Sequence, residues 1–412
     1  MSSLCILGRQ PALGLAELES LFGADSVQPA GAGAALIGLS PDTIPFNRLG
    51  GSLKCGLVIK TIDSTGWREI EKALQSCLRQ VTRAMPEGKV QLGLSIYGIR
   101  VSSSQLLATG LTLKKSLKSD GRTVRLVPNT DIELNAASVI HNHLTGPTGC
   151  ELLVVRDGNQ TIIAQTVHVQ DIDNYTVRDR DRPKRDARVG MLPPKLAQII
   201  INLATGRHKD RQATTSRPSS PDQVSTILDP FCGTGVILQE AMLMNYGAYG
   251  TDIEPRMIEY SEANLEWLTT NWPSPPPYLC EVGDATDHRW GPIFTYVACE
   301  TYLGRPFTSP PSPDVLRQTV SDCNLIIKKF LRNIYEQLPA GARLCIAVPA
   351  WQTRPGVFVH LPLTAQSSGS SVDSIEELGY NRISFEHARS EDLIYRRDDQ
   401  IVARELLILT KL

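Results

Sequence analysis

The sequence predicts an α+β segment followed by a doubly wound α/β domain. Three observations lead to this prediction. Short apolar runs alternate with amphipathic stretches from residue 224 onward, which is typical of strands and helices that alternate around a parallel sheet. The turn DPFCGTG, residues 229–235, lies between one such strand and the next helix. Before these elements, a stretch rich in Arg and Asp, residues 175–190, lacks apolar periodicity and separates the two parts.

The composition limits the classes of protein that the chain can represent. Its 412 residues exceed one typical domain of about 100–200 residues, so more than one core is expected. The 42 basic and 43 acidic side chains exclude a uniformly basic nucleic-acid binder and leave room only for a local basic surface. No apolar run reaches the roughly 20 residues of a membrane span, and the first residues do not form a signal peptide. We therefore expect a cytoplasmic protein that does not enter membranes.

The cysteines and histidines argue against a disulfide framework and against a metal site. The nine cysteines are an odd number without a C-x-x-C pair, and the seven histidines form no H-x-x-x-H pair. We expect reduced, mostly buried thiols and no bound metal.

Two small α+β modules are expected before the charged stretch, over residues 1–60 and 61–170. In the first module, an apolar run at 4–7 predicts a strand, and leucines at 13, 15, 18 and 21 predict a helix. The second module alternates in the same way. Its expected helices are 68–83 and 104–118, and its expected strands are 90–95, 124–127, 150–155 and 161–168.

A linker is expected over residues 171–223. Its first part, 175–190, has the interspersed charges of a solvated connector. Pro193 and Pro194 then open a helix, because apolar residues follow at helical spacing and proline is tolerated in a first turn. The polar, Ser/Thr/Pro-rich stretch 206–223 predicts a mobile loop.

The remaining residues, 224–412, are expected to form the doubly wound domain with an antiparallel end. Helices are predicted over 236–245, 255–268 and 314–338, and strands over 225–229, 248–252, 294–300 and 344–348. A closing hairpin is predicted from 393–397 and 401–409.

The DPFCGTG turn is a candidate nucleoside site. Gly233 and Gly235 permit a close backbone approach at the amino end of a helix, and Asp252 at the end of the next strand suits ribose hydroxyls. At the following strand end, Asp284 suits an adenine amino group. A P-loop is excluded because no G-K-[ST] follows, and Leu238 replaces the third glycine of a dinucleotide motif. Asp229 before the turn favours a ligand with a positive end, such as the ammonium and sulfonium of S-adenosylmethionine.

The chain resembles the tRNA guanosine-2-amino methyltransferases that carry a THUMP domain before a Rossmann-fold methyltransferase domain. The similarity is most specific over 175–252, in DPFCGTG, Asp252 and RPKRDARVGMLPPKLAQIIINLATG. The stretches LGRQPALGLAELESLFG and VRLVPNTDIELNAASVIHNHL are also similar to that family. The resemblance implies an N-terminal ferredoxin-like module, a THUMP-like RNA-binding module and a Rossmann-fold class I domain that uses S-adenosylmethionine. It implies that the cofactor is lined by Met191, Leu192, Asp229, Pro230, Cys232, Gly233, Gly235, Asp252, Ile253, Asp284 and Ala285.

The strand tip that would hold the target base departs from the family pattern. Such amine methyltransferases have Asp or Asn, two prolines and an aromatic residue there, because acceptors must hold the N–H groups and a ring must clamp the base. Here the tip is Glu300-Thr301-Tyr302-Leu303-Gly304. Glu300 and Tyr302 are the candidate catalytic residues in a variant geometry. The altered tip is also compatible with a different target atom, or with a protein that binds RNA without catalysis.

Phosphate contacts are expected from the charged linker. Its candidate RNA-binding residues are Arg178, Arg182, Lys184, Arg185 and Arg188. Interspersed aspartates leave a salt-bridged surface linker as the alternative. The sequence thus favours a tRNA methyltransferase acting on a guanosine 2-amino group. The alternatives are a silent RNA-binding relative and a methyltransferase for a non-RNA amine.

Overall fold

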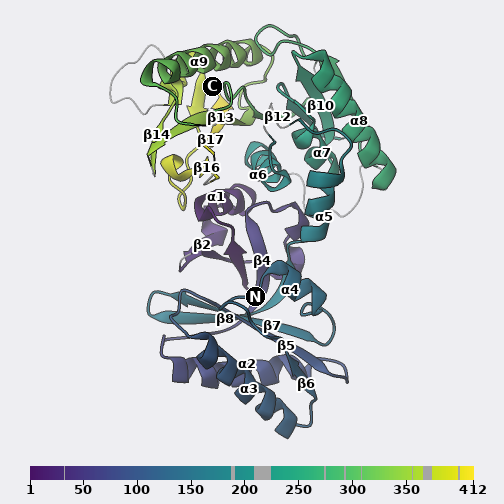
Figure 1. Cartoon of the computed structure of the whole chain (residues 1–412), viewed down its shortest axis with the longest axis vertical. Helices are drawn as coiled ribbons and strands as arrows, with labels where there is room; N and C mark the ends of the chain where they lie inside the picture. Colours follow the sequence, from purple (N-terminus) through teal and green to yellow (C-terminus); the bar gives the residue numbers. More distant parts are fainter. Residues whose placement is uncertain are drawn as a thin grey trace. The chain divides into compact units, whose positions relative to one another are not determined.

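The computed structural model of the chain contains two compact units, Met1–Asn174 and Tyr175–Leu412 (Figure 1). We refer to them as unit 1 and unit 2. The structure describes residues 1–31, 33–186, 191–207, 224–272, 275–291, 294–307, 309–354, 356–364, 374–397 and 400–412. The expected loop at 206–223 lies almost wholly outside these residues.

Unit 1 is built on one eight-stranded sheet with the order β2-β3-β1-β4-β8-β7-β5-β6. Its strands are β1 (Ser3–Leu7), β2 (Val27–Ala30), β3 (Ala34–Ile37), β4 (Ser52–Ile62), β5 (Val90–Tyr97), β6 (Val124–Leu126), β7 (Gly149–Asp157) and β8 (Gln160–Val169). Strand β4 pairs with β1 on one side and with β8 on the other. A continuous sheet therefore runs through residue 60, and the division into two modules stays a prediction.

The three helices that the sequence predicts in unit 1 are confirmed, and two further short helices were not predicted. They are α1 (Pro11–Phe22), α2 (Trp67–Arg83), α3 (Ser103–Ser119), α4 (Ala136–His141) and α5 (Ile172–Thr176), which runs into unit 2. Helices α2 and α3 lie on the same face of the sheet (Figure 1). There Ile70, Leu74 and Leu78 of α2 form a core with β5 and β7, because residues three to four apart share one helix face.

Unit 2 contains the predicted doubly wound sheet. Its main strands are β9 (Thr226–Asp229), β10 (Gly247–Asp252), β11 (Tyr278–Val282), β12 (Tyr296–Glu300), β13 (Arg343–Arg354), β15 (Tyr380–Arg382) and β17 (Val402–Lys411). Their order is β11-β10-β9-β12-β13-β17-β15, and the first five are parallel. Strand β17 is antiparallel to both neighbours. Numbered along the chain, the order of these main strands is 3-2-1-4-5-7-6.

Two short strands, β14 (Val357–Val359) and β16 (Ile394–Tyr395), pair with β13 and β17 outside the main order. The pairing of β16 with β17 confirms the predicted closing hairpin. Unit 2 also contains α6 (Pro194–Thr205), α7 (Val236–Leu243), α8 (Pro255–Asn271) and α9 (Pro313–Tyr335). Among these, α9 packs against the sheet through Cys323, Ile327, Phe330 and Ile334.

Helix α6 belongs to unit 2 and is not part of a linker. Every residue from Leu196 to Thr205 is buried, and the helix packs on α7, β12 and β13. The helix itself and its opening at the two prolines are confirmed. The sequence assigned this helix to the linker, whereas its buried residues pack on the sheet of unit 2 and on α7.

The prediction of mostly buried thiols is confirmed. All nine cysteines are free, and all except Cys280 are buried. Among the described residues, no helix combines the length and the apolar composition needed to cross a bilayer.

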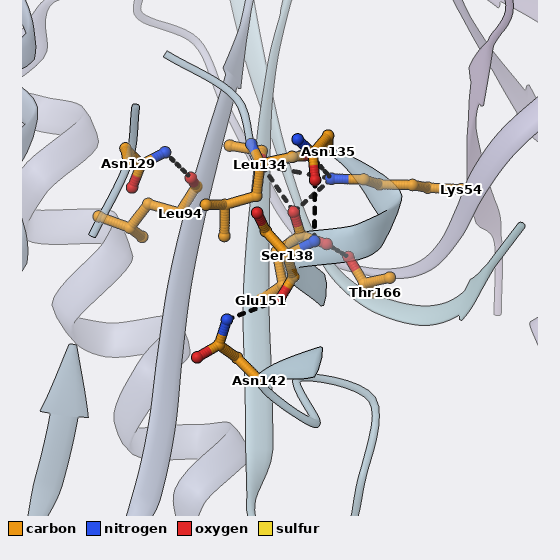
Figure 2. A network of polar contacts seen from close by, with 10 residues as sticks. Lys54, Leu94, Asn129, Leu134, Asn135, Ser138, Asn142, Glu151 and Thr166 are labelled. Carbon is orange, nitrogen blue, oxygen red and sulfur yellow. Dashed lines mark hydrogen bonds and ion pairs between the residues drawn. The ribbon is translucent and has the colours of Figure 1, made fainter. Parts of the chain in front are cut away.

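A buried ion pair holds unit 1 together across its sheet. Lys54 of β4 and Glu151 of β7 are paired and almost fully buried (Figure 2). The Lys54 Nζ also donates to the Leu134 carbonyl at 2.7 Å, and Thr166 Oγ1 donates to Glu151 Oε2 at 2.6 Å. Ser95 Oγ donates to Glu151 Oε1 at 2.6 Å and accepts from the Leu134 N–H at 2.9 Å. The pair therefore ties β4, β7, β8 and the segment before α4 to one point.

We expect Glu151→Leu to lower the free energy of unfolding of unit 1 by about 3–5 kcal/mol, because it leaves the Lys54 ammonium buried without its partner. The double substitution Lys54→Met, Glu151→Leu should recover most of this loss. Urea unfolding of the whole chain, with hydrogen exchange in β7, measures it. Arg79→Ala, which breaks an exposed pair with Asp120, is the control and should change the free energy by only about 0–1 kcal/mol. An equal cost for the single and double variants would contradict the expectation.

Candidate cofactor-binding and catalytic site

The glycine turn between β9 and α7 has the backbone shape that the sequence predicts. Gly233 and Gly235 have φ of 52° and 80°, in the left-handed region that favours glycine. A Cβ on Gly235 would lie 3.0 Å from Ser261 Oγ of α8, so the turn rests directly on that helix. By contrast, the nearest atom to a Cβ on Gly233 would be 4.0 Å away. The turn is tightly packed on one side and open at Gly233.

Asp229 lies at the end of β9 and is only 2% exposed. Its Oδ1 accepts from the Phe231 N–H at 3.1 Å. Burial raises the pKa of Asp229 well above its usual range, and the negative charges of Asp252 and Glu300 raise it further against that hydrogen bond. A buried carboxyl in this state is stabilised in its charged form by a cation.

Asp252 closes the turn from the end of β10. Its Oδ2 accepts from the Gly233 N–H at 2.9 Å, and its Oδ1 accepts from the Glu254 N–H at 3.0 Å. Burial raises the pKa of Asp252, and these two N–H groups oppose the shift. A carboxylate has about four acceptor positions, so Asp252 keeps capacity for a further donor such as a hydroxyl.

The third predicted strand end is beside the second. The Gly283 N–H donates to the Asp252 carbonyl at 3.0 Å, which joins the ends of β10 and β11. Asp284 accepts from the Thr286 N–H at 2.9 Å, and Ala285 is buried behind it. Ile253, which directly follows Asp252, is exposed. The structure therefore places Asp252, Ile253 and Asp284 at one edge of the sheet.

The altered strand tip at β12 is held by an arginine from β17. Arg404 Nε donates to Glu300 Oε1 at 2.7 Å, and Arg404 Nη1 donates to Gln400 Oε1 at 3.0 Å. Arg404 is 4% exposed, so this ion pair is largely removed from water. Thr301 is also fixed, because its hydroxyl donates to the Ala347 carbonyl at 3.0 Å. Tyr302 next to it is 44% exposed.

The other residues that were predicted to line the cofactor have fewer contacts that relate them to the glycine turn. Pro230 and Cys232 are buried in the turn, and the Cys232 N–H donates to the Thr251 carbonyl at 2.9 Å. Leu192 is buried before α6, and Met191 is half-buried and accepts from Arg185. A role for Met191 and Leu192 at the cofactor stays a prediction.

The expectation of a solvated connector was wrong for two of its arginines. Arg178 is 8% exposed and donates to Glu240 Oε1 of α7 at 2.9 Å, and Arg182 is 3% exposed. The error arose because interspersed charges resemble a solvated surface, whereas a buried Glu240 partners one of them. Burial opposes phosphate contacts from both. Lys184 and Arg185 are exposed, and Arg188 lies outside the described residues.

The rest of the connector is bound along α8. The Lys184 N–H donates to Asn264 Oδ1 and its carbonyl accepts from Asn264 Nδ2, both at 2.9 Å. Asn264 Nδ2 also donates to the Thr234 carbonyl at 2.8 Å. Further along, Arg256 pairs with Asp186 at 3.0 Å. One side chain therefore joins the connector to the glycine turn.

A basic surface at one end of unit 1 was missed from the sequence. Residues 79–125 contain nine Lys and Arg residues but only two acids, Glu87 and Asp120. The parallel strands β5 and β6 begin at this end, and α2 and α3 end there. We call this surface the basic end; it consists of Arg83, Lys89, Lys114, Lys115, Lys118 and Arg125. A count of charge in successive windows would have revealed it, because the near-neutral total conceals it.

No protein-family model matches the chain. Parts of it are similar to curated archaeal proteins named tRNA (guanine(10)-N2)-dimethyltransferase. The Pyrococcus abyssi protein is 32% identical over 186 residues, which cover 43% of this chain and 46% of that protein. The Methanothermobacter thermautotrophicus protein is 29% identical over 160 residues, covering 39% of each. The chain thus matches less than half the length of these relatives.

Among solved structures, TrmN from Thermus thermophilus is 18% identical with a TM-score of 0.49, and the alignment covers 100% of both chains.

Among the described residues, no group of three or more His, Cys, Asp or Glu side chains is arranged to hold a metal ion.

Proposed function

We propose that the chain is a tRNA methyltransferase that takes its methyl group from S-adenosylmethionine and acts on the exocyclic 2-amino group of a guanosine. One observation carries the proposal: Asp229 and Asp252 lie at neighbouring strand ends around the open glycine turn. The names of the archaeal relatives support the substrate class. A cytoplasmic location is part of the proposal.

The residues at this edge fit the cofactor. The buried Asp229 suits its ammonium group, and Asp252 suits its ribose hydroxyls. Asp284 suits the adenine amino group, and the exposed Ile253 offers an apolar surface for the ring. When bound, the cofactor supplies an electrophilic methyl group on a sulfonium.

Glu300 and Tyr302 are the proposed catalytic residues. A guanine amino group is a weak nucleophile, and it loses a proton when its nitrogen takes the methyl group. Arg404 occupies Glu300 Oε1, and no hydrogen bond to Glu300 Oε2 is present within the described residues. We assign Oε2 the role of acceptor for the amino group. Tyr302, 44% exposed, supplies a ring on which the base can stack.

The basic end of unit 1 is the proposed contact for the RNA backbone. Its cations make no ion pair within the described part of the chain, so phosphates would not have to displace an acid. Arg83 and Lys118 lie in the last turns of α2 and α3, where a cation also stabilises the helix dipole. This explanation does not apply to Lys89, which precedes β5, or to Arg125, which lies in β6. No aromatic residue except Tyr97 occurs in 79–125, which favours phosphate contacts over base stacking.

The direct test of the proposed function is incubation of the pure protein with labelled S-adenosylmethionine and bulk tRNA, followed by digestion to nucleosides. Label in 2-methylguanosine is the expected result. Cofactor binding without transfer would instead indicate a silent RNA-binding protein. Label only on an added non-RNA amine would indicate a different substrate class.

The same assay tests Glu300. Glu300→Gln should reduce methyl transfer at least about a hundredfold, because an amide accepts the amino proton far more weakly than a carboxylate. Cofactor affinity, measured by calorimetry, should stay nearly unchanged. Equal transfer by the variant and the parent would remove Glu300 from the mechanism.

Cofactor affinity should fall as the pH falls through the raised pKa of Asp229, because protonation removes the negative charge that attracts the ammonium. The raised pKa means that the folded chain holds this proton more tightly than the unfolded chain. Its contribution to stability is therefore present at low pH and lost as the pH rises.

Asp229→Asn should bind the cofactor at least about tenfold more weakly at neutral pH, with a flatter pH dependence and no loss of thermal stability. Calorimetry from pH 5 to 8 and thermal unfolding measure both effects. Glu259→Gln, at an exposed carboxylate of α8 outside the proposed site, is the control and should leave both measurements unchanged. An unchanged pH dependence in Asp229→Asn would show that another group titrates.

The double substitution Lys115→Gln, Lys118→Gln in the basic end should weaken tRNA binding at least about tenfold. It should also lower the slope of log affinity against log salt by about two, roughly one per phosphate contact. Lys329→Gln, Arg332→Gln on α9 is the matched control, because it removes two exposed cations with the same helical spacing. An equal loss of tRNA affinity in both variants would show that only the net charge of the protein matters.

A further inference from the structure

Arg305 is an exposed cation that follows the β12 tip, three residues after Tyr302. Within the described part of the chain it makes no hydrogen bond and no ion pair. Its guanidinium carbon lies over the Phe307 ring, 5.6 Å from the ring centre. Other exposed arginines of unit 2 are paired with acids, namely Arg256, Arg289, Arg317 and Arg389. Arg305 therefore keeps its charge available for a ligand.

The chain between the strand tip and Arg305 is fixed at two points. Thr301 is held to β13 by its N–H and its hydroxyl, which donate to one carbonyl at 2.9 and 3.0 Å. Gly304 has a φ of 82°, in the left-handed region that favours glycine. A Cβ on Gly304 would lie 2.8 Å from Thr319 Cγ2, so the chain lies directly against α9. The backbone therefore leads to Arg305 along a fixed path.

The charge of Arg305 acts on the Tyr302 hydroxyl. Burial raises the pKa of Tyr302, and the neighbouring Cys323 and Asp322 raise it further. The positive charge of Arg305 opposes this shift, so the guanidinium is near the ring on which the base is proposed to stack. Asp322 accepts from Gln318 Nε2 at 2.8 Å and forms no ion pair with Arg305 within the described residues. The cation beside Tyr302 is thus not neutralised.

We propose that Arg305 binds a phosphate group on the sugar of the nucleotide whose base is methylated. This inference rests on the proposed function and deepens it. A base that stacks on Tyr302 brings its phosphates with it, because only the sugar separates them from the base. The base must leave its stack before its amino group can reach the methyl donor. A cation that holds the phosphate of the extruded nucleotide stabilises that state without reading the base.

The contact with Phe307 suits this role. An arginine over an aromatic ring is attracted to the face of the ring, whereas its N–H donors lie in the plane of the guanidinium and stay available. Two such donors match two oxygens of one phosphate group. The exposure of Arg305 also suits a phosphate in a polymer, which can reach a surface cation without opening the protein.

The first test separates this contact from general RNA binding. Arg305→Gln should lower the single-turnover rate of methyl transfer at saturating tRNA at least about tenfold, because it destabilises the extruded nucleotide. The dissociation constant of tRNA should change by less than about threefold, because the basic end supplies the other phosphate contacts. Arg305→Lys, which keeps the charge, should restore part of the rate. Arg289→Gln, on an exposed arginine paired with Glu336, is the matched control and should equal the parent in rate and affinity.

The second test isolates the phosphate group. Guanosine, its 5′-monophosphate and its 3′-monophosphate differ only in that group, and their binding to the full chain is measured by calorimetry with S-adenosylhomocysteine present. The parent should bind one of the two monophosphates at least about fivefold more tightly than guanosine. Arg305→Gln should remove this preference, while its affinity for guanosine stays within about twofold of that of the parent. The preferred monophosphate identifies which phosphate is bound.

An unchanged transfer rate in Arg305→Gln would overturn the proposal, and so would a parent that prefers neither monophosphate to guanosine. An equal loss of guanosine and its monophosphates would also overturn it, because it would place Arg305 against the base. A loss of S-adenosylmethionine affinity in the variant would assign Arg305 to the cofactor instead. An Arg305-dependent preference for a monophosphate in a parent that transfers no methyl group to tRNA would refute the proposed function and support the phosphate site.

Discussion

The hydrogen bond from the Gly233 N–H to Asp252 Oδ2, at 2.9 Å, is the constraint on which the site depends. It fixes the glycine turn of β9 to the end of β10. The Gly283 N–H then joins β10 to β11 through the Asp252 carbonyl. The same hydrogen bond fixes the position of the Asp252 carboxylate and favours its charged form, because the N–H group opposes the rise of its pKa. The turn is open at Gly233, whereas Gly235 packs against Ser261 of α8.

Unit 2 contains two kinds of buried charge, and they serve different purposes. Arg178 with Glu240 and Arg404 with Glu300 are compensated, so they fix the connector and the β12 tip at small net cost. Within the described residues, Asp229 and Arg182 are buried without an ion-pair partner, and a buried unpaired charge lowers the stability of the free chain. Groups of this kind are typical of ligand sites, where stability is exchanged for affinity.

Periodicity in the sequence was sufficient for most helices and for the strand ends that carry Asp229 and Asp252, but it missed the long strand β4. It was insufficient for β14 and β15, since three residues cannot establish a period. It also could not pair Glu300 with Arg404, which lies 104 residues away, because such a contact depends on strand order. Arg178 and Arg182 were misplaced for a related reason. Glu240, which partners Arg178, lies on a mostly apolar helix, and only the fold reveals how that helix packs.

The β12 tip differs from the family pattern in having a glutamate and in lacking both prolines, and the contact with Arg404 accounts for these differences together. A glutamate has one more rotatable bond than an aspartate, so a free Glu300 would hold its carboxylate less precisely than the shorter residue of the family pattern. Arg404 removes that freedom by binding Oε1, and Thr301, in place of a proline, binds the Ala347 carbonyl and fixes the backbone. Together these bonds replace rigid covalent geometry by two buried polar contacts. The tip therefore keeps one fixed acceptor, Glu300 Oε2, although neither proline is present.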